Sequence, residues 1–135
     1  MDNAKVIKLK GNIDERGSLV VVQGLEDIPF EIKRIFYIYG TNKDNVRGKH
    51  ANRNSEFVLI NLSGSTDIWV HDGKKEGLYT LNKPDIGLYL PKMTWKNMFN
   101  FSEDSILLVL ASEIYNPEEY IKDFNEFIKE VNKNG

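Results

Sequence analysis

The 135-residue chain contains no cysteine, which excludes disulfide bonds, thiolate nucleophiles and cysteine-ligated zinc. It contains only two histidines, His50 and His71, so few imidazoles are available for metal binding or proton transfer. Long apolar runs are also missing. The longest, Ile106 to Ala111, is far shorter than the ~20 residues of a membrane-spanning helix. Because Met1 to Lys10 is too charged for a secretory leader, we expect a cytoplasmic protein with no membrane partner.

A surplus of charge of one sign is absent as well. The chain has 18 basic and 20 acidic residues, a formal net charge of −2, so nothing in the total attracts nucleic acid and we expect no nucleic-acid partner. Hydrophobic residues make up 41% and charged residues 28%, which is typical of a folded protein. The length predicts a single domain over residues 1–135.

Short strand-like segments follow one another along most of the chain. Lys5 to Lys10 alternates charged and apolar residues, as a half-buried edge strand does, and Ile32 to Tyr39 is rich in β-branched and aromatic residues. Asp72-Gly73 between apolar stretches is a strong hairpin signal. Roughly ten such strands with turns every ~8 to 12 residues predict an all-β sandwich or barrel over about residues 1–114.

One amphipathic helix is predicted at the C-terminal end, over about residues 117–132. Asn116 is a good N-cap, Pro117 suits the first helical position, and two glutamates follow. Apolar residues then recur every three or four positions, on one helix face: Tyr120, Ile121, Phe124, Phe127, Ile128 and Val131. This face packs on the barrel, on a second subunit or, as a less favoured alternative, on a membrane surface.

The central stretch from Arg47 to Gly64 carries the most informative spacing. Gly48, His50, Asn52 and Glu56 resemble the first signature of the cupin superfamily, which implies a jelly-roll β-barrel. In metal-binding cupins these positions supply ligands, joined by a later histidine. Here Asn52 stands at one ligand position and Lys96 at the later one, and a protonated lysine repels a divalent ion. We therefore expect no metal and no other cofactor.

Without a metal, proton transfer is the chemistry that these residues favour. His50 is the best general base in the chain, since an imidazole has an ordinary pKa of ~6.5. Removal of a proton beside a carbonyl creates an enolate, and Arg16 and Lys96 are candidates to stabilise that charge. The alternative is that His50 is a hydrogen-bonded core residue. Against it, Asn52 shares the same strand face, and buried polar groups occur in satisfied sets.

Basic and aromatic residues interrupt several strand-like segments. Arginines at a barrel mouth grip a diphosphate bidentately, and aromatic rings flank a base or sugar. Alternatively, the charges are solvated strand edges and the rings belong to the core. The residues concerned are Lys33, Arg34, Arg47, Arg53 and Lys96 among the cations, and Phe36, Tyr37 and Trp95 among the aromatics.

Five segments narrow the resemblance to one family. RGSL, IPFEIKRIFYI, RGKHAN, the pair GLYL and TWKNMFNFS, and LLVLASEIYNPEEYI together resemble the sugar 3,4-ketoisomerases. That resemblance implies a homodimer of jelly-roll barrels that converts a dTDP-linked 4-keto-6-deoxyglucose into its 3-keto isomer without a metal, in 3-amino-deoxysugar synthesis. It also implies that His50 moves a proton from C3 to C4 through an enediol.

The residue patterns and the resemblance together give the expected site residues. Catalysis is expected from His50, Arg16 and Lys96, and substrate binding from Arg34, Phe36, Arg47, Asn52 and Trp95. The edge strand Lys5 to Lys10 invites pairing with a second chain, which agrees with a homodimer.

Two departures from the family pattern keep alternatives open. Asn52 replaces a histidine that is common in the family, and an amide cannot carry a proton at neutral pH. Arg16 resembles galacto-forming members, whereas Lys96 stands where relatives have His or Arg and leaves the C4 configuration open. The alternatives are a 3,5-epimerase acting on the same type of sugar, a non-catalytic sugar-nucleotide-binding cupin and, least favoured, a metal-dependent dioxygenase.

Overall fold

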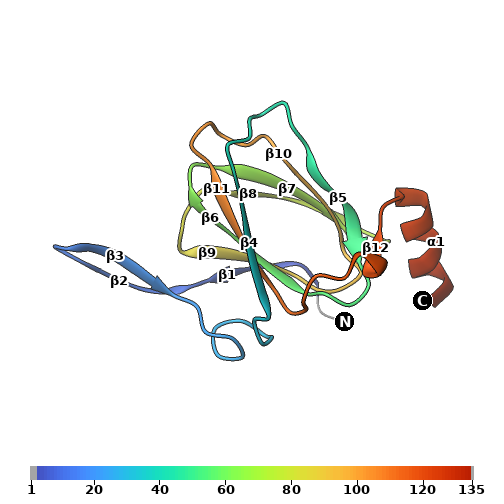
Figure 1. Ribbon diagram of the computed structural model, residues 1–135, viewed down its shortest axis with the longest axis horizontal. Coiled ribbons are helices and arrows are strands. Elements are labelled where there is room, and N and C mark those ends of the chain that lie inside the picture. Colours follow the sequence, from blue (N-terminus) through green and yellow to red (C-terminus); the bar gives the residue numbers. More distant parts are fainter. Residues whose placement is uncertain (1–2, 135) are drawn as a thin grey trace.

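Alternation of buried and exposed side chains along the strands assembles two sheets around an apolar layer. The computed structural model describes residues 3–134, and its antiparallel strands form two five-stranded sheets (Figure 1). The first has the order β1 (Lys5–Lys8), β9 (Ile86–Leu90), β6 (Phe57–Ser63), β11 (Ile106–Ala111), β4 (Arg34–Tyr39). The second has the order β12 (Tyr120–Ile121), β5 (Arg47–Asn52), β10 (Trp95–Phe99), β7 (Thr66–His71), β8 (Glu76–Leu81).

The main core lies between these sheets. Phe57 and Leu59 from β6 meet Ile68 and Val70 from β7, and all four are buried. The predicted all-β jelly roll of the cupin type with one C-terminal α-helix is therefore confirmed as the fold class. In residues 3–134 the sheets are not hydrogen-bonded into a closed barrel, because β1 and β4 end one sheet and β12 and β8 end the other. The expected edge position of the first strand is confirmed.

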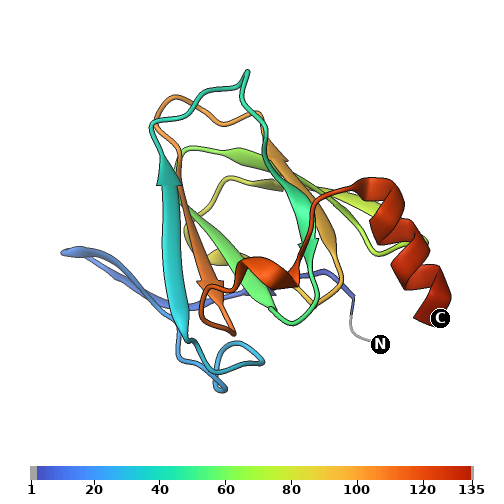
Figure 2. The same ribbon diagram turned by 45° about the vertical axis from the view of Figure 1, so that its right-hand side comes forward.

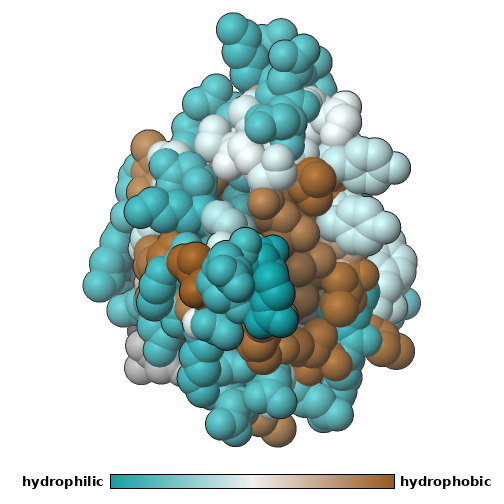
Figure 3. Space-filling view, turned by 90° about the vertical axis from the view of Figure 1, so that its left-hand side faces the viewer, coloured by the Kyte–Doolittle hydropathy of each residue, from teal (hydrophilic) through white to brown (hydrophobic). Residues whose placement is uncertain are grey.

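The outer face of the first sheet is covered only in part. Leu9, Ile28 and Phe30 from the N-terminal third pack over Val58 and Tyr89 in a second buried cluster. The outer face of β4 stays uncovered, with Tyr37 62% and Tyr39 70% exposed. Figure 3 shows a patch of apolar residues on this side of the molecule, bordered by hydrophilic ones.

A two-stranded hairpin extends away from both sheets (Figure 1). It consists of β2 (Lys10–Asp14) and β3 (Gly17–Val21), and every residue of both strands is exposed. Ile13 is 81% and Leu19 is 59% exposed. An isolated two-stranded hairpin of this kind is marginally stable at best in water.

The C-terminal helix begins later than the sequence predicts. Asn116 does cap a helical turn, since its Oδ1 accepts a hydrogen bond from Glu118 N at 3.0 Å, but that turn is the short 3-10 helix η1 (Pro117–Glu119). Tyr120 and Ile121 then pair with β5 as β12. The predicted start at residue 117 was therefore wrong, because sheet pairing here outweighs helix propensity.

The α-helix α1 spans Phe124–Asn134 and lies against the outside of the second sheet (Figure 2). Asp123 caps it, because its Oδ1 accepts from Glu126 N at 3.0 Å. Phe127 is fully buried and packs with Ala51, Trp95 and Ile121. Of the partners left open for the apolar stripe, the structure shows packing on the chain's own second sheet. No helix among residues 3–134 has the length and apolar character needed to cross a bilayer.

Candidate active site

Two neighbouring strands of the second sheet bring His50 and Lys96 together. They are register partners on β5 and β10, and His50 Nε2 lies 3.5 Å from Lys96 Nζ. The sheet is irregular here, with a register shift between Lys96 and Asn97. Gly48 supports the irregularity, since it has φ +88° and an added Cβ would lie 2.8 Å from the Lys96 carbonyl oxygen. A glycine is needed at this close approach.

The surroundings of His50 determine which of its two ring nitrogens carries the proton. Its Nδ1 lies 2.9 Å from the Gly48 carbonyl, which can only accept, so Nδ1 carries the proton and Nε2 keeps its lone pair. The Tyr120 ring lies 4.7 Å from the imidazole, centroid to centroid. Burial and the charge of Lys96 lower the pKa of His50 to about 4. His50 is therefore a neutral base at pH 7.

Lys96 is a buried amine that forms no ion pair with any carboxylate in residues 3–134. It is 2% exposed, and its Nζ lies 4.0 Å from the centroid of the Phe57 ring. Burial, followed by the positive charge of Arg34, lowers its pKa to about 7, while Glu119 acts in the opposite direction. Both forms of the amine are therefore populated near neutral pH.

Buried polar atoms without partners gather beside this pair. Arg34 Nε and Nη2 have no hydrogen-bond acceptor, and neither amide atom of Asn52 makes a hydrogen bond of good geometry. The Asn52 amide nevertheless lies close enough to Glu119 to help lower the pKa of that carboxyl. The guanidinium of Arg34 lies 5.4 Å from the Phe36 ring centroid and 5.7 Å from that of Tyr115. Unpaired buried groups of this kind are expected to meet a ligand.

Glu119 anchors the segment that carries Tyr115 and Tyr120 by hydrogen bonds to the loop after β5. Its Oε1 accepts from the backbone N–H groups of Asn54 at 3.0 Å and Ser55 at 2.8 Å, and its Oε2 accepts from Ser55 Oγ at 2.6 Å. These bonds hold the pKa of the buried carboxyl below its usual range, against the opposing effect of burial. These hydrogen bonds hold η1 against the loop after β5, and so place Tyr120 against His50.

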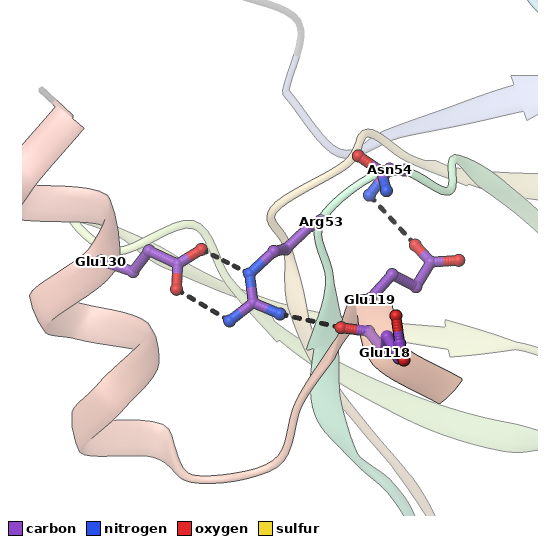
Figure 4. A network of polar contacts seen from close by, with 5 residues as sticks. All are labelled: Arg53, Asn54, Glu118, Glu119 and Glu130. Atoms are coloured by element: carbon purple, nitrogen blue, oxygen red, sulfur yellow. Dashed lines mark hydrogen bonds and ion pairs between the residues drawn. The ribbon is translucent and has the colours of Figure 1, made fainter. Parts of the chain in front are cut away.

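Arg53 belongs to the same network but serves the helix. Figure 4 shows its guanidinium donating to both carboxylate oxygens of Glu130 on α1, at 2.8 and 3.0 Å, and to the Glu118 carbonyl at 3.2 Å. Three of the five N–H donors of Arg53 are therefore engaged within the chain, where they join the loop after β5 to α1 and η1.

Three other predicted site residues lie apart from His50 within this chain. Trp95 faces the opposite side of β10 from Lys96 and is 5% exposed under α1, with its ring centroid 5.3 Å from that of Phe124. Arg16 is at the tip of the hairpin, its side chain 86% exposed and paired with Asp14 at 2.7 Å. Arg47 is exposed at the start of β5.

Glu56, the carboxylate of the cupin-like spacing, also turns away from His50. Its Oε1 accepts from Tyr89 Oη at 2.6 Å, and Tyr89 belongs to the outer cluster of the first sheet. Among residues 3–134 no group of three or more His, Cys, Asp or Glu side chains is arranged to hold a metal ion.

Sequence reasoning missed Tyr115, Tyr120 and Glu119 as parts of the site. The two rings lie 6.0 Å apart, and they line the approach to Arg34 and His50. The signal available was the aromatic pair that flanks Asn116-Pro117. The sequence instead predicts a helix from about residue 117, which places Glu119 and Tyr120 on the wrong element.

A separate cavity of about 430 Å³ lies between β8 and the loop before β10, lined by residues including Val70, Tyr79, Met93 and Thr94. None of His50, Lys96 or Arg34 lines it. We place the site at the His50–Lys96 pair because the titratable groups and unpaired polar atoms converge there.

The chain matches known proteins over nearly its whole length. The family model FdtA, described as WxcM-like, C-terminal, matches residues 2–132. A curated TDP-4-oxo-6-deoxy-alpha-D-glucose-3,4-oxoisomerase from Aneurinibacillus thermoaerophilus is 41% identical over 133 residues, which are 98% of this chain and 95% of that protein.

Solved structures agree with these matches. QdtA, a sugar 3,4-ketoisomerase from Thermoanaerobacterium thermosaccharolyticum solved with TDP, is 41% identical, has a TM-score of 0.94, and is matched over 98% of this chain and 96% of its own. A TDP-fucose 3,4-ketoisomerase from Campylobacter jejuni is 46% identical with a TM-score of 0.93 over 98% of both chains. A TDP-quinovose 3,4-ketoisomerase from the same organism is also 46% identical, with a TM-score of 0.91 over 96% of this chain and 99% of its own. The chain therefore belongs to the FdtA family, described as WxcM-like, C-terminal.

Proposed function

We propose that this protein is a 3,4-ketoisomerase that converts TDP-4-keto-6-deoxyglucose into a TDP-linked 3-keto-6-deoxyhexose. The observation that carries the proposal is the free Nε2 of His50, a neutral base held beside a buried amine and unpaired polar groups. A curated relative with 41% identity catalyses 3,4-oxo-isomerisation of such a sugar.

His50 transfers the carbon-bound proton in this proposal. Its Nε2 removes the proton from C3, which is acidic because it lies beside the C4 carbonyl, and the resulting imidazolium returns it to C4. The intermediate is an enediol, and the charge that develops on its oxygens is stabilised by Lys96 and Arg34 in a dry environment. No metal takes part in this scheme, so chelators leave the rate unchanged.

Substrate binding falls to residues around this base. Arg34 supplies two unpaired donor atoms for anionic or hydroxyl oxygens, and Asn52 supplies both a donor and an acceptor. Phe36 and Tyr115 flank the Arg34 guanidinium, and the exposed Tyr115 ring is available to stack on the thymine base.

We also propose that the protein acts as a homodimer in which the hairpin of one subunit covers the site of the other. The hairpin is fully exposed and carries apolar Ile13 and Leu19, while β4, the strand that carries Arg34, is a free sheet edge with an exposed apolar outer face. Pairing of the β2–β3 hairpin with the β4 edge of a second subunit would supply partners for the unpaired backbone groups of that edge and support for the hairpin. This arrangement gives Arg16 access to a partner's His50.

The proposed product has the galacto configuration at C4, on the basis of Arg16. Overall identity does not decide the matter, because the chain is 46% identical to both the fucose and the quinovose enzymes.

The test is incubation of the purified protein with TDP-4-keto-6-deoxyglucose, followed by proton NMR of the product. We expect a 3-keto sugar whose H4 coupling constants give the C4 configuration. In D₂O, deuterium at C5 identifies a 3,5-epimerase instead, and TDP binding without any new sugar identifies a binding protein.

The matched variants use the two histidines of the chain. His50→Asn should abolish turnover while leaving TDP binding intact. His71→Asn should leave the rate unchanged, because His71 lies on the outer face of β7 against Phe124. Unchanged turnover in the His50 variant removes it from the role of base.

A further inference from the structure

Isomerisation moves two protons, and His50 accounts for only one of them. The carbon-bound proton passes from C3 to C4, but the hydroxyl proton must also leave O3 and another must arrive at O4. Nδ1 of His50 is held by the Gly48 carbonyl at 2.9 Å, so a single imidazole nitrogen faces the substrate. Asn52 cannot replace a second imidazole, because an amide does not exchange protons at neutral pH.

We propose that Lys96 is the second acid–base residue, which carries the hydroxyl proton between O3 and O4 while His50 carries the carbon proton. This inference rests on the proposed 3,4-ketoisomerase function and goes beyond a role for Lys96 as a fixed positive charge. Its basis is geometric: Lys96 Nζ lies 3.5 Å from the free nitrogen of His50, in register on the adjacent strand, so both groups reach neighbouring atoms of one sugar.

The proton balance closes with these two groups alone. His50 Nε2 takes the proton from C3 as the Lys96 ammonium donates one to O4, which leaves a neutral enediol, an imidazolium and a neutral amine. The Lys96 amine then takes the proton from O3 while the imidazolium gives its proton to C4. The C3 carbonyl forms, and both residues return to their starting states without a net change of charge.

The environment of Lys96 permits both halves of this cycle. Three charged or titratable groups act on its amine: His50 from β5, Arg34 from β4 and Glu119 from η1. Burial and Arg34 lower its pKa to about 7, although Glu119 opposes them. A general acid and base works best when its pKa lies near the operating pH. A lysine in water, with a pKa of ~10.4, would donate readily but would rarely be present as the amine.

The two possible roles of Lys96, fixed charge or proton carrier, predict different rates for the Lys96→Arg variant. Arg keeps a positive charge at every accessible pH and cannot give up its proton. If Lys96 is only a fixed charge, Lys96→Arg preserves much of the rate. If it exchanges a proton, the variant loses the general acid–base contribution, about 10²–10⁴-fold in kcat/KM.

The experiment measures kcat/KM against pH for the wild-type protein, Lys96→Arg and Lys96→Met, with Lys92→Arg as a matched control. Lys92 is an exposed lysine shortly before β10 and lies outside the site. Because the protonated amine starts the cycle, wild-type kcat/KM should fall as pH rises through about 7. Both Lys96 variants should lack this limb and keep their TDP affinity, and the Lys92 variant should match the wild type.

Each outcome bears on the inference differently. A Lys96→Arg variant within about threefold of the wild-type rate, or an alkaline limb that persists in Lys96→Met, overturns the role of Lys96 and leaves the proposed isomerase function standing. A wild-type protein that forms no 3-keto sugar overturns both. Lys96→Met retains the unbranched shape of the side chain without its charge, so it supplies a folded variant if arginine does not fit.

Discussion

Arg34 is half-buried, and two of its guanidinium atoms, Nε and Nη2, are buried without a hydrogen-bond partner. An unsatisfied buried donor costs about 1–3 kcal/mol, and more when it is charged. This destabilisation is expected at a ligand-binding site, because the bound ligand supplies the missing acceptors. Arg34 also lowers the pKa of Lys96 through its charge. One residue thus connects ligand binding with the proton chemistry.

We predict that Arg34→Gln weakens TDP binding by about 10- to 150-fold, the equivalent of the 1.5–3 kcal/mol of a charged hydrogen bond. Removal of its charge also raises the pKa of Lys96, so the alkaline limb of kcat/KM moves to higher pH. Titration calorimetry and a pH–rate profile measure the two effects. Lys33→Gln is the control, since Lys33 is an exposed neighbour. Wild-type TDP affinity in the Arg34 variant contradicts its role in binding.

The residue scale also shows where sequence reasoning succeeds and fails. The spacing of the central stretch placed His50 and Asn52 on the inner face and identified Lys96 at the later ligand position, and the structure brings these three together. Trp95 and Lys96 are consecutive, so on a strand only one of them can face inward. The sequence alone does not decide which one does, because both strand faces are buried here, one by the core and one by α1.

At the scale of elements, α1 supports the site from outside. Its buried Phe127 packs on Ala51 of β5 and Trp95 of β10, the residues adjacent in sequence to His50, Asn52 and Lys96. The ion pair of Arg53 with Glu130 also joins α1 to the loop after β5, but both side chains are partly exposed, at 41% and 30%. Apolar packing should therefore dominate the docking of the helix.

We predict that Phe127→Ala lowers the free energy of unfolding by about 3–5 kcal/mol, because it empties a fully buried aromatic site. Glu130→Gln should cost less than about 1 kcal/mol, and that loss should shrink further at high salt. Urea denaturation of the two variants and the wild type measures both. Equal losses would contradict the dominance of apolar packing, because the ion pair would then contribute as much as the apolar contact.

At the scale of the whole molecule, strand periodicity and turn spacing predict an all-β sandwich or barrel, and the resemblance to the cupins is what implies a jelly roll. They could not predict how the sheets terminate. The β3 segment is strand-like in sequence, yet the hairpin that it forms with β2 leaves the chain's own sheets and exposes all its residues. Local patterns do not distinguish a strand that pairs within its own chain from one that pairs with another, because the backbone requirement is the same.

The position of Arg16 on the hairpin leads to a prediction about active sites that combine residues of two subunits. If Arg16 reaches the site of a partner, each site combines His50 of one subunit with Arg16 of the other. Arg16 pairs only with Asp14 in its own hairpin among residues 3–134, so Arg16→Ala should fold normally.

We predict a dimer by light scattering, and near-complete loss of turnover in both Arg16→Ala and His50→Asn when each is assayed alone. Co-expression of the two variants should restore about a quarter of the wild-type rate, because about half of the dimers are mixed and each mixed dimer has one complete site of two. A monomer at assay concentration contradicts the arrangement. So does a dimer without any gain on mixing, since that result places Arg16 and His50 in sites that do not exchange residues.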